Sequence, residues 1–343
     1  MSVPAAELPL SPATTLEPPP RESDPDRERH HPERPAELVD DTADIPHPSP
    51  LVIEPEGEPV ELVIEPRKGW IGIDWQELFR NRELLYFLVW RDIKVRYKQA
   101  VLGVGWAVLQ PVVQMVVFTL IFGIAARMRG SLPQGLPYSV FVLSGLIPWQ
   151  LFVTSLGGGG MSLVNQQHLL TKIYFPRLFI PTSVAGGALM DMGISSVLFV
   201  VLLAINGIAP TWGVLLLPPL LVLTLLVSLG MSYLLAALTV TYRDFRFLIP
   251  FMAQIWMWVS FVAFPPPHAV ETWRWRWVLA FNPMYPIISA YRKILLGGVP
   301  GMEDWMIGWH WSYLWASIAT SVAIFLLGLF YFRKTERRFS DIA

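Results

Sequence analysis

Six long apolar stretches dominate this sequence and limit the folds that it can adopt. A helix needs about 20 apolar residues to cross a hydrocarbon core of ~30 Å, since its backbone must satisfy its own hydrogen bonds there. Hydrophobic residues make up 53% of the chain and charged residues only 15%, too few for a soluble protein of this size. We therefore predict an all-α integral membrane protein with six transmembrane helices. The predicted spans cover residues 102–126, 138–156, 178–205, 212–240, 247–264 and 311–332.

A seventh apolar stretch, residues 277–298, is interrupted by Asn282-Pro283 and by Arg292-Lys293. With six spans and a cytosolic N-terminus, 14 Lys and Arg residues close to the membrane face the cytosol and six face outward, as the positive-inside rule favours. A seventh span would move the four basic residues between 333 and 338 to the outside. We therefore predict that both termini are inside (N-in/C-in) and that residues 265–310 form a re-entrant outer segment between spans five and six.

Residues 1–66 differ from the rest of the chain in charge and composition. They hold 16 acidic and 4 basic side chains and 15 of the 31 prolines, whereas the remaining residues hold 11 acidic and 22 basic side chains. Such a segment buries too little apolar surface to offset its ordering entropy, so we predict a disordered acidic Pro-rich N-terminal tail. Its start lacks the basic and apolar regions of a signal peptide, and we expect the tail to stay in the cytosol.

Residues 67–100 are predicted to form a cytosolic amphipathic interface helix ahead of a transmembrane domain over residues 101–343. Asp74 and Glu77 fit a helix N-terminus, and the following pattern suits a helix in the headgroup layer with its basic face on anionic lipid. A simple anchor for the first span is the alternative. The apolar residues that recur at helical spacing are Trp75, Leu78, Phe79, Leu85, Tyr86, Val89 and Ile93.

The sequence features of an enzyme are missing. The chain has no cysteine, its six histidines lack metal-ligand spacing, and neither a Walker A nor a G-x-S-x-G motif occurs. We therefore predict no catalytic site, no metal site and no cofactor on this chain. Asp191 is the only acidic residue in the predicted spans. It is expected to make a helix–helix hydrogen bond, to cap a helix at a bend, or to relay protons.

Two groups of apolar side chains suggest surfaces for partners. Leu169, Leu170, Ile173, Tyr174 and Phe175 lie in the connection over residues 165–177, where they would form a costly exposed patch without a partner. This predicts a short helix that docks onto a soluble protein, with a plain loop as the alternative. Aromatic side chains in the spans form either interfacial belts or the lining of a path for sugars. The candidates for lining a channel are Trp106, Phe118, Phe122, Trp149, Phe152, Trp256 and Trp258.

Several short motifs, in register along residues 75–340, are shared with one family. They are WRDIKVRYK at residues 90–98, LGVGW at 102–106 with Gln110-Pro111, SGL at 144–146 with Trp149, KIYFPR at 172–177, YRDFR at 242–246, and NPM at 282–284 with Tyr291-Arg292. On these motifs the chain resembles ABC-2 type permeases, above all the subunits that export O-antigen, teichoic acid and capsular polysaccharide.

The resemblance implies a transport subunit and not an enzyme. Two copies of this chain would form a homodimeric channel, with two separate ABC ATPase subunits that hold ATP and Mg. The implied substrate is a glycan on an undecaprenyl diphosphate carrier, exported across the bacterial cytoplasmic (inner) membrane, and no nucleic-acid partner is expected. Two alternatives stay open at this point: an ABC-2 permease for a drug or simple lipid, and a membrane enzyme or scaffold without transport.

The resemblance also implies candidate site residues. The residues that would couple the chain to the ATPase are Asn165, His168, Leu169, Leu170, Lys172, Ile173, Tyr174, Phe175, Pro176 and Arg177. The outer gate would comprise Asn282, Pro283, Met284, Tyr291 and Arg292. Basic side chains at the substrate entrance would either attract the diphosphate or serve as ordinary positive-inside charges. They are Arg91, Lys94, Arg96 and Lys98.

Overall fold

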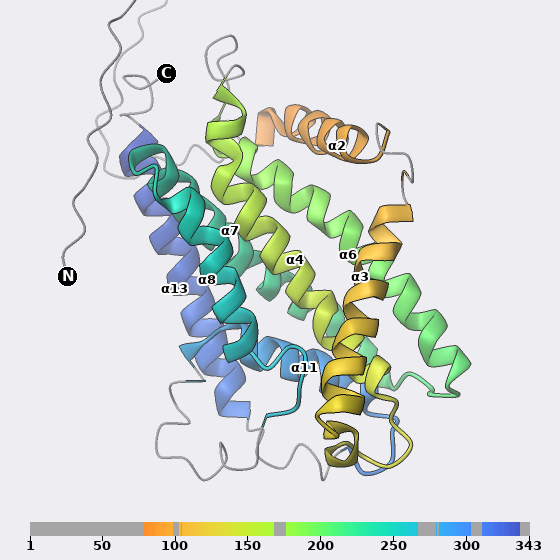
Figure 1. Ribbon diagram of the computed structural model, residues 1–343. Helices are drawn as coiled ribbons and strands as arrows, with labels where there is room; N and C mark the ends of the chain where they lie inside the picture. Colours follow the sequence, from red (N-terminus) through yellow and green to blue (C-terminus); the bar gives the residue numbers. More distant parts are fainter. Residues whose placement is uncertain are drawn as a thin grey trace, which may run out of the picture. The chain divides into compact units, whose positions relative to one another are not determined.

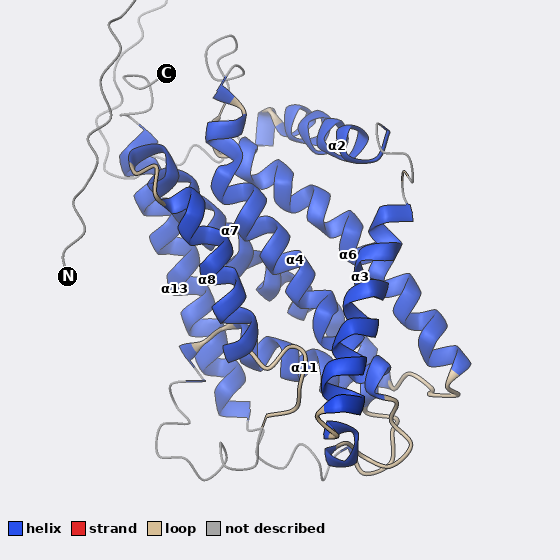
Figure 2. Ribbon diagram, in the orientation of Figure 1, coloured by secondary structure: helices blue, strands red, loops and turns tan. Residues whose placement is uncertain are grey.

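The computed structural model describes residues 79–98, 103, 105–167, 176–266, 279, 281–302 and 311–336. The chain divides into two units, Met1–Pro66 and Arg67–Ala343, and all of the described residues belong to the second. Every regular element among them is a helix (Figure 2). The predicted tail over residues 1–66 and the predicted helix start at Asp74 and Glu77 lie outside the described residues.

Within the described part of the chain, five helices are long and apolar enough to cross a membrane. Each begins close to the start of a predicted span, so the hydropathy pattern located these five correctly. They are α3 (Gly105–Phe118) with its π-helical continuation η2 (Thr119–Ala125), α4 (Tyr138–Asn165), α6 (Phe179–Ile205), α7 (Leu217–Thr241) with the preceding η4 (Trp212–Leu216), and α13 (Trp311–Glu336).

α8 (Phe245–Val259) corresponds to the predicted fifth span but is shorter than predicted. Its 15 residues extend about 22 Å, less than the ~30 Å of a hydrocarbon core. The helix ends because Phe261 adopts a left-handed backbone conformation, with a φ of 51°, which few residues other than glycine adopt. The predicted span therefore runs past the end of the helix, and a sixth full-length crossing stays a prediction.

α11 (Met284–Leu296) occupies the seventh apolar stretch. Its 13 residues extend about 20 Å and are too short to cross the membrane as one helix. The helix is mostly buried, and it packs against α4, α7 and α13 at the end of the bundle away from α2 (Figure 1). The length of α11 agrees with the prediction that this stretch does not cross, while its assignment to a re-entrant outer segment stays a prediction.

α2 (Arg82–Lys98) lies across α6 at the opposite end of the bundle (Figure 1). Its apolar residues do not form a single face, in contrast to the predicted amphipathic pattern. Leu88 is buried and Val89 is half-buried, whereas Tyr86 and Phe87 are each 63% exposed. One side of α2 therefore packs on the bundle, and another side presents aromatic rings to the surroundings.

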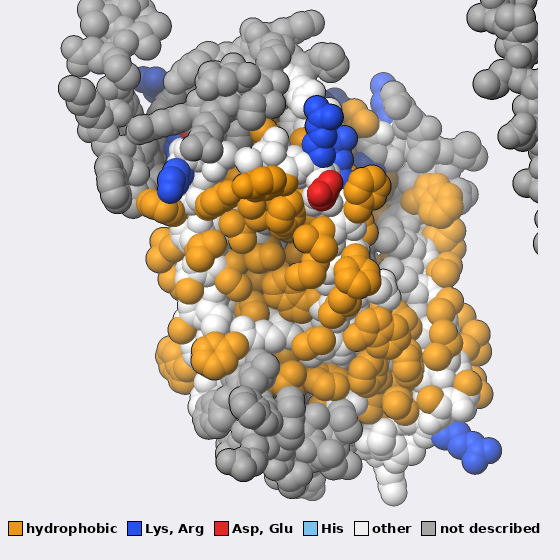
Figure 3. Space-filling view, turned by 60° about the vertical axis from the view of Figure 1, so that its left-hand side comes forward, with side chains coloured by type: hydrophobic (Ala, Val, Ile, Leu, Met, Phe, Trp, Pro, Cys, Tyr) orange, Lys and Arg blue, Asp and Glu red, His pale blue; other side chains and the backbone are white. Residues whose placement is uncertain are grey.

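The long helices follow one another in alternate directions (Figure 1). Figure 3 shows a broad band of hydrophobic side chains over one face, with most of the Lys and Arg side chains of that view beyond one edge of the band. Large apolar side chains are exposed on several helices, as in Val197 of α6, Val222 of α7 and Leu326 of α13. Such a surface is suited to lipid and would be unfavourable in water.

α4 is the central helix of the bundle. In its most apolar part 78% of the residues are buried, against 11% for α3. Small residues allow close approach of the neighbouring backbones. A Cβ added at Gly159 of α4 would lie 2.6 Å from Oγ of Ser232 on α7, and one added at Gly230 of α7 would lie 2.6 Å from Cα of Phe325 on α13. These contacts hold α4, α7 and α13 together as one packed layer.

Candidate functional site

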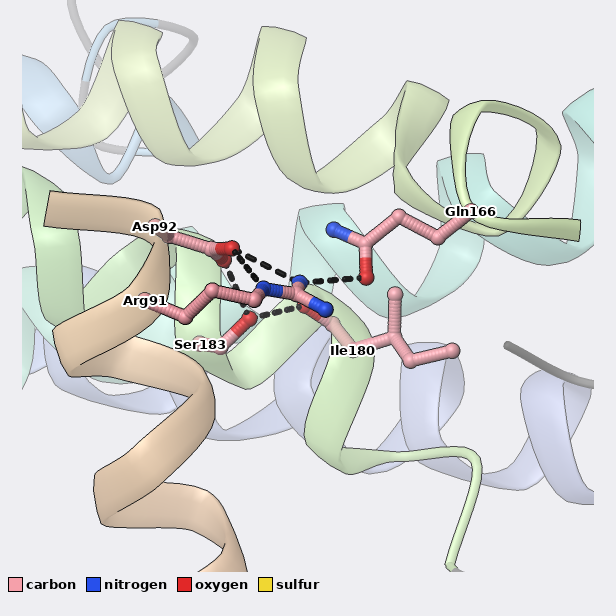
Figure 4. Close-up of polar contacts among 5 residues, drawn as sticks. All are labelled: Arg91, Asp92, Gln166, Ile180 and Ser183. Carbon is pink, nitrogen blue, oxygen red and sulfur yellow. Dashed lines mark hydrogen bonds and ion pairs between the residues drawn. The ribbon is translucent and has the colours of Figure 1, made fainter. Parts of the chain in front are cut away.

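A polar network joins α2 to α4 and α6 at one end of the bundle (Figure 4). Nη2 of Arg91 donates to Oδ1 of Asp92 at 2.7 Å and to Oε1 of Gln166, just beyond α4, at 2.8 Å. Oδ2 of Asp92 lies 2.8 Å from the hydroxyl of Ser183 on α6, which also lies 2.9 Å from the carbonyl oxygen of Ile180. Three helices therefore share one set of charge-assisted contacts.

A second contact attaches α2 to α6 further along both helices. Asp191 of α6 accepts hydrogen bonds from the guanidinium of Arg96 and the hydroxyl of Tyr97. Burial and the hydrogen bond to Asp191 raise the pKa of Tyr97 to about 12. On α6, Gly186 lies between Ser183 and Asp191, and a Cβ added there would lie 2.6 Å from Cγ2 of Val89 on α2, so the helices touch. Of the roles predicted for Asp191, the structure contains the helix–helix hydrogen bond.

The four predicted entrance residues therefore fall into two pairs. Arg91 and Arg96 are engaged with carboxylates of α2 and α6. Lys94 and Lys98 are exposed, and Nζ of Lys94 lies 5.5 Å from the ring centroid of Trp90. Two ammonium groups are thus accessible to an anion on this side of α2, while the two guanidinium groups fix the position of the helix. An entrance role stays a prediction for all four.

The connection between α4 and α6 is held at both of its ends. Asn165 is the last residue of α4, and the following Gln166 accepts the hydrogen bond from Arg91. After Pro176, Nη1 of Arg177 donates to the carbonyl oxygen of Glu336 on α13 at 2.9 Å. The other predicted coupling residues lie outside the described residues: His168, Leu169, Leu170, Lys172, Ile173, Tyr174 and Phe175. A displacement of this connection would be passed to α2 at one end and to α13 at the other.

Asn282 organises the start of α11 at the other end of the bundle. Its Oδ1 accepts hydrogen bonds from Nε1 of Trp256 at 2.7 Å and from the backbone N–H of Met284 at 3.1 Å. Its Nδ2 donates to Oγ of Ser260 at 3.0 Å. One amide therefore caps the first turn of α11 and binds it to the last turn of α8.

Arg292 holds the chain where α8 ends. Its guanidinium donates to the carbonyl oxygens of Phe261 at 2.9 Å and Val262 at 2.5 Å, and a cation is favoured beside such unpaired carbonyls. The guanidinium carbon lies 3.9 Å from the ring centroid of Phe141. Gly145 makes room for it, since an added Cβ would lie 2.6 Å from Nη2. Burial lowers the pKa of Arg292 to about 9.

The remaining predicted gate residues also belong to this buried group. The carbonyl oxygen of Pro283 accepts a hydrogen bond from Oγ of Ser317 on α13 at 2.8 Å. Tyr291 is only 2% exposed and lies in the main hydrophobic core. The structure thus brings all five predicted gate residues onto one short helix and its start, packed against three neighbours. Gating by them stays a prediction.

The predicted channel aromatics separate into two groups by burial. Trp149 and Phe152 of α4 are 3% and 0% exposed, and the ring of Phe152 meets Trp256 of α8 edge to face at 4.9 Å. These rings have little free surface within a single chain. The second group is partly exposed and joins α3 and η2 to α8; its members are Phe118, Phe122 and Trp258, which contact one another in sequence. Trp106, at the start of α3, is 52% exposed.

Sequence reasoning missed several partners of these residues. Gln166 and Ser183 complete the network around Arg91, and Gly145 makes room for Arg292. The adjacent charges of Arg91 and Asp92, within a shared motif, could have indicated an ion pair. No pattern in the nearby sequence predicts the contacts of Ser183 or Gly145, because their partners are distant in the sequence.

The fold and these contacts define a class of protein. Five long apolar helices are joined by polar contacts at the two ends of the bundle, and the described residues contain no group of His, Cys, Asp and Glu that could hold a metal. The chain is a multi-pass membrane protein whose polar contacts join helices to one another. A sequence profile for the family described as ABC-2 type transporter matches residues 83–296. The chain belongs to the ABC-2 type transporter family.

Curated relatives agree with this assignment. The chain is 36% identical over 219 residues to the O-antigen export system permease protein RfbA of Myxococcus xanthus, covering 64% of this chain and 82% of the relative. It is 25% identical over 264 residues to an O-antigen export system permease protein RfbA of Klebsiella pneumoniae, covering 76% and 95%. It is also 25% identical over 221 residues to the polysialic acid transport protein KpsM of Escherichia coli, covering 61% and 79%. The predicted resemblance to polysaccharide-exporting ABC-2 permeases is confirmed, as is the predicted multi-pass localisation.

Proposed function

We propose that this chain is the permease subunit of an ABC exporter that moves a polysaccharide, linked to undecaprenyl diphosphate, across the bacterial cytoplasmic membrane. The observation that carries the proposal is its 36% identity to an O-antigen export permease over 82% of that relative. A relative named for polysialic acid transport supports a glycan substrate. The alternative of a drug or simple-lipid permease finds no support among these names.

In this proposal, two copies of the chain form the channel, and two ATPase subunits bind to them on the cytosolic side of the membrane. ATP and Mg are held by the ATPase subunits, and this chain carries no cofactor. The ATPase would contact the connection over residues 165–177, whose ends bond to α2 through Gln166 and to α13 through Arg177. These bonds supply a physical route from ATP-driven movement to the transmembrane helices.

The anionic end of the substrate would first meet the basic side of α2. Lys94 and Lys98 are exposed there, and a compact ammonium group is attracted to diphosphate without fixing it in one geometry. Arg91 and Arg96 would keep α2 in position through their carboxylate partners. The partly exposed aromatic rings of α3 and α8 would then offer flat surfaces to the C–H faces of sugars.

The proposal is tested by depleting the protein and locating the lipid-linked glycan. We expect the glycan to accumulate on its carrier inside the cell and to disappear from the surface, and a plasmid copy of the wild-type chain should restore export. A matched strain with a hydrolysis-deficient ATPase subunit should show the same accumulation. Surface glycan that is unchanged after depletion would refute the proposed substrate.

The coupling role is tested separately, at residues outside the described part. Replacing Tyr174 and Phe175 together by Ala should reduce export about 25-fold while ATP hydrolysis by the assembled complex continues, since a buried apolar contact with a partner contributes about 1 kcal/mol, or about fivefold, per residue. Both activities would be measured in the same vesicles. Export at the wild-type level would exclude these two side chains as the coupling contact.

A further inference from the structure

The middle of α3 and α4 carries uncharged polar side chains that none of the contacts above explains. α3 presents Gln110 and Gln114, and α4 presents Gln150 and Thr154, with Gly157 one turn further along. Gln110 is exposed, and the other four are half-buried. The four polar side chains and Gly157 together form the polar row.

Gln114 is the member whose position most needs a partner. Its Oε1 is buried, yet within the described residues it accepts no hydrogen bond. An amide oxygen that is buried without a donor is unfavourable. Because the Gln114 side chain as a whole is only half-buried, a rotation of its amide would present this oxygen to water, to another chain or to a ligand.

The three glutamines lie at similar depth. Gly123 packs against the ring of Tyr138, where an added Cβ would lie 3.0 Å from Cγ, and α3 and α4 pack together in opposite directions (Figure 1). From that contact, a rise of about 1.5 Å per residue places Gln114 about 13 Å along α3, Gln110 about 20 Å along α3 and Gln150 about 18 Å along α4. The amide of Gln150 on α4 therefore lies at a depth between those of Gln114 and Gln110 on α3.

Gly157 extends the row by leaving open space. A Cβ added there would meet no atom within 4 Å. The next three glycines differ, because added Cβ atoms would meet Val184 at Gly158, Ser232 at Gly159 and both Ile249 and Leu235 at Gly160, all within 3.0 Å. Three of the four consecutive glycines therefore serve helix packing. Gly157, one turn beyond Thr154 and two turns beyond Gln150, faces away from the neighbouring helices.

On α3 and η2 the two amides lie between predicted channel residues. Trp106, Gln110, Gln114, Phe118 and Phe122 are spaced by four residues. Side chains four residues apart are neighbours on a helix, and the row turns gradually around the helix axis because a turn takes about 3.6 residues. On α4, Nε2 of Gln150 donates to Oγ1 of Thr154 at 3.3 Å, so these two groups are already oriented by one another. Neutral donors and acceptors thus lie beside flat aromatic surfaces.

We propose that the polar row lines a hydrated path in which the hydroxyl groups of the exported glycan exchange hydrogen bonds with Gln110, Gln114, Gln150 and Thr154. This assignment rests on the proposed export function. Amides and hydroxyls both donate and accept, as sugar hydroxyls do. Being uncharged, they bind each sugar weakly enough for the chain to move on. Gly157 keeps the path wide, where any larger side chain would narrow it.

The path is tested by cysteine accessibility, since the chain contains no cysteine of its own. Gln114→Cys, Gln150→Cys and Thr154→Cys would be compared with Val113→Cys and Val117→Cys, whose native side chains are 49% and 42% exposed on α3. In vesicles holding the full permease and ATPase, a charged methanethiosulfonate should label the first three about tenfold faster, because thiolates form in water and not in lipid. Accumulated lipid-linked glycan should slow that labelling.

Two results would overturn the path. Labelling of Gln114→Cys and Gln150→Cys no faster than of Val113→Cys would place the row in lipid. Spontaneous disulfide-linked dimers of Gln114→Cys, without labelling, would show that the amide meets a second copy of this chain.

A substitution at Gly157 gives an independent functional test. Gly157→Phe should reduce export at least about tenfold by narrowing the path, while membrane level and ATP hydrolysis are retained, because the added ring enters open space. Gly193→Phe on α6 is the matched control, since Gly193 also has no atom within 4 Å of an added Cβ. If wild type exports glycan and the two variants export equally, the path is wrong. If wild type exports no glycan, the proposed function itself fails.

Discussion

The two ends of the bundle use arginine in opposite ways. At the α2 end, Arg91 and Arg96 pair with carboxylates while their side chains stay 37% and 38% exposed. At the α11 end, Arg292 is 2% exposed and donates to backbone carbonyls against an aromatic ring. Exposed ion pairs contribute little and exchange easily, whereas a buried guanidinium cannot leave its partners without a large penalty. The contacts that hold α2 should therefore cost less to break than those of Arg292 at the α11 end.

The largest expected effect comes from removing the buried guanidinium. Arg292→Leu should lower the free energy of unfolding by about 3 kcal/mol, because two carbonyls lose a charged donor, and the Tm in detergent should fall by about 6 °C or more. Lys293→Leu, at the adjacent half-buried position, is the control. Equal Tm values for the two variants would contradict the conclusion that the buried contacts of Arg292 stabilise the α11 end of the bundle.

A smaller, local effect is expected where α2 is bonded to α6. Asp191→Asn removes the charge that Arg96 pairs with and should weaken the attachment of α2 by about 1–2 kcal/mol. Amide exchange in α2 should then be about tenfold faster, while exchange in α7 is unchanged. Asp244→Asn, at an exposed acidic residue between α7 and α8, serves as the control. Unaltered exchange in α2 would mean that this ion pair does not hold the helix.

The network around Gln166 should affect coupling more than stability. Arg91→Gln breaks the contact between α2 and the end of α4 and should reduce glycan exported per ATP about fivefold, for the loss of roughly 1 kcal/mol. The control is Arg82→Gln, an exposed position at the start of α2. A parallel fall in export and ATP hydrolysis would indicate a folding defect and contradict a role in coupling.

The smallest effect is expected at the exposed ammonium groups. The double variant Lys94→Gln, Lys98→Gln should reduce export about twofold to fivefold at low ionic strength, and the difference should vanish near 1 M salt because exposed charges are screened. Lys334→Gln, at an exposed position near the end of α13, should change nothing at either salt concentration. A salt-independent defect would argue against attraction of the diphosphate.

The sequence predicted the long helices because hydropathy depends on nearby residues alone. It did not predict the length of α8, where the helix ends early because Phe261 adopts a left-handed conformation and Arg292 donates to the carbonyl oxygens beyond the helix. The residues near Phe261 show no pattern that predicts its contact with the guanidinium of Arg292, which lies 31 positions further along the chain. The length of α8 therefore depends on a contact that only the folded bundle supplies.

The site could be predicted by residue type but not by partner. The sequence indicated that Arg91, Arg96 and Arg292 matter, yet it placed the first two at an entrance and the third at a gate. The structure adds their partners, which lie on other helices: Gln166, Asp191 and the carbonyls after α8. The role of a charged residue in a membrane bundle depends on which helix it contacts. The periodicity of residues within one helix does not contain that information.

The burial of α4 has a consequence for how the protein is made. α4 is the least apolar of the five long helices, yet it is the most enclosed. Its serines and glycines contact α6 and α7, which the ribosome delivers later. During synthesis α4 enters the bilayer before these helices are present. Lipid contacts stabilise its small polar residues only weakly. The insertion of α4 becomes stable only after α6 and α7 have been synthesised and have packed against it. Biogenesis should therefore be most sensitive to a delay in synthesis between α4 and α7.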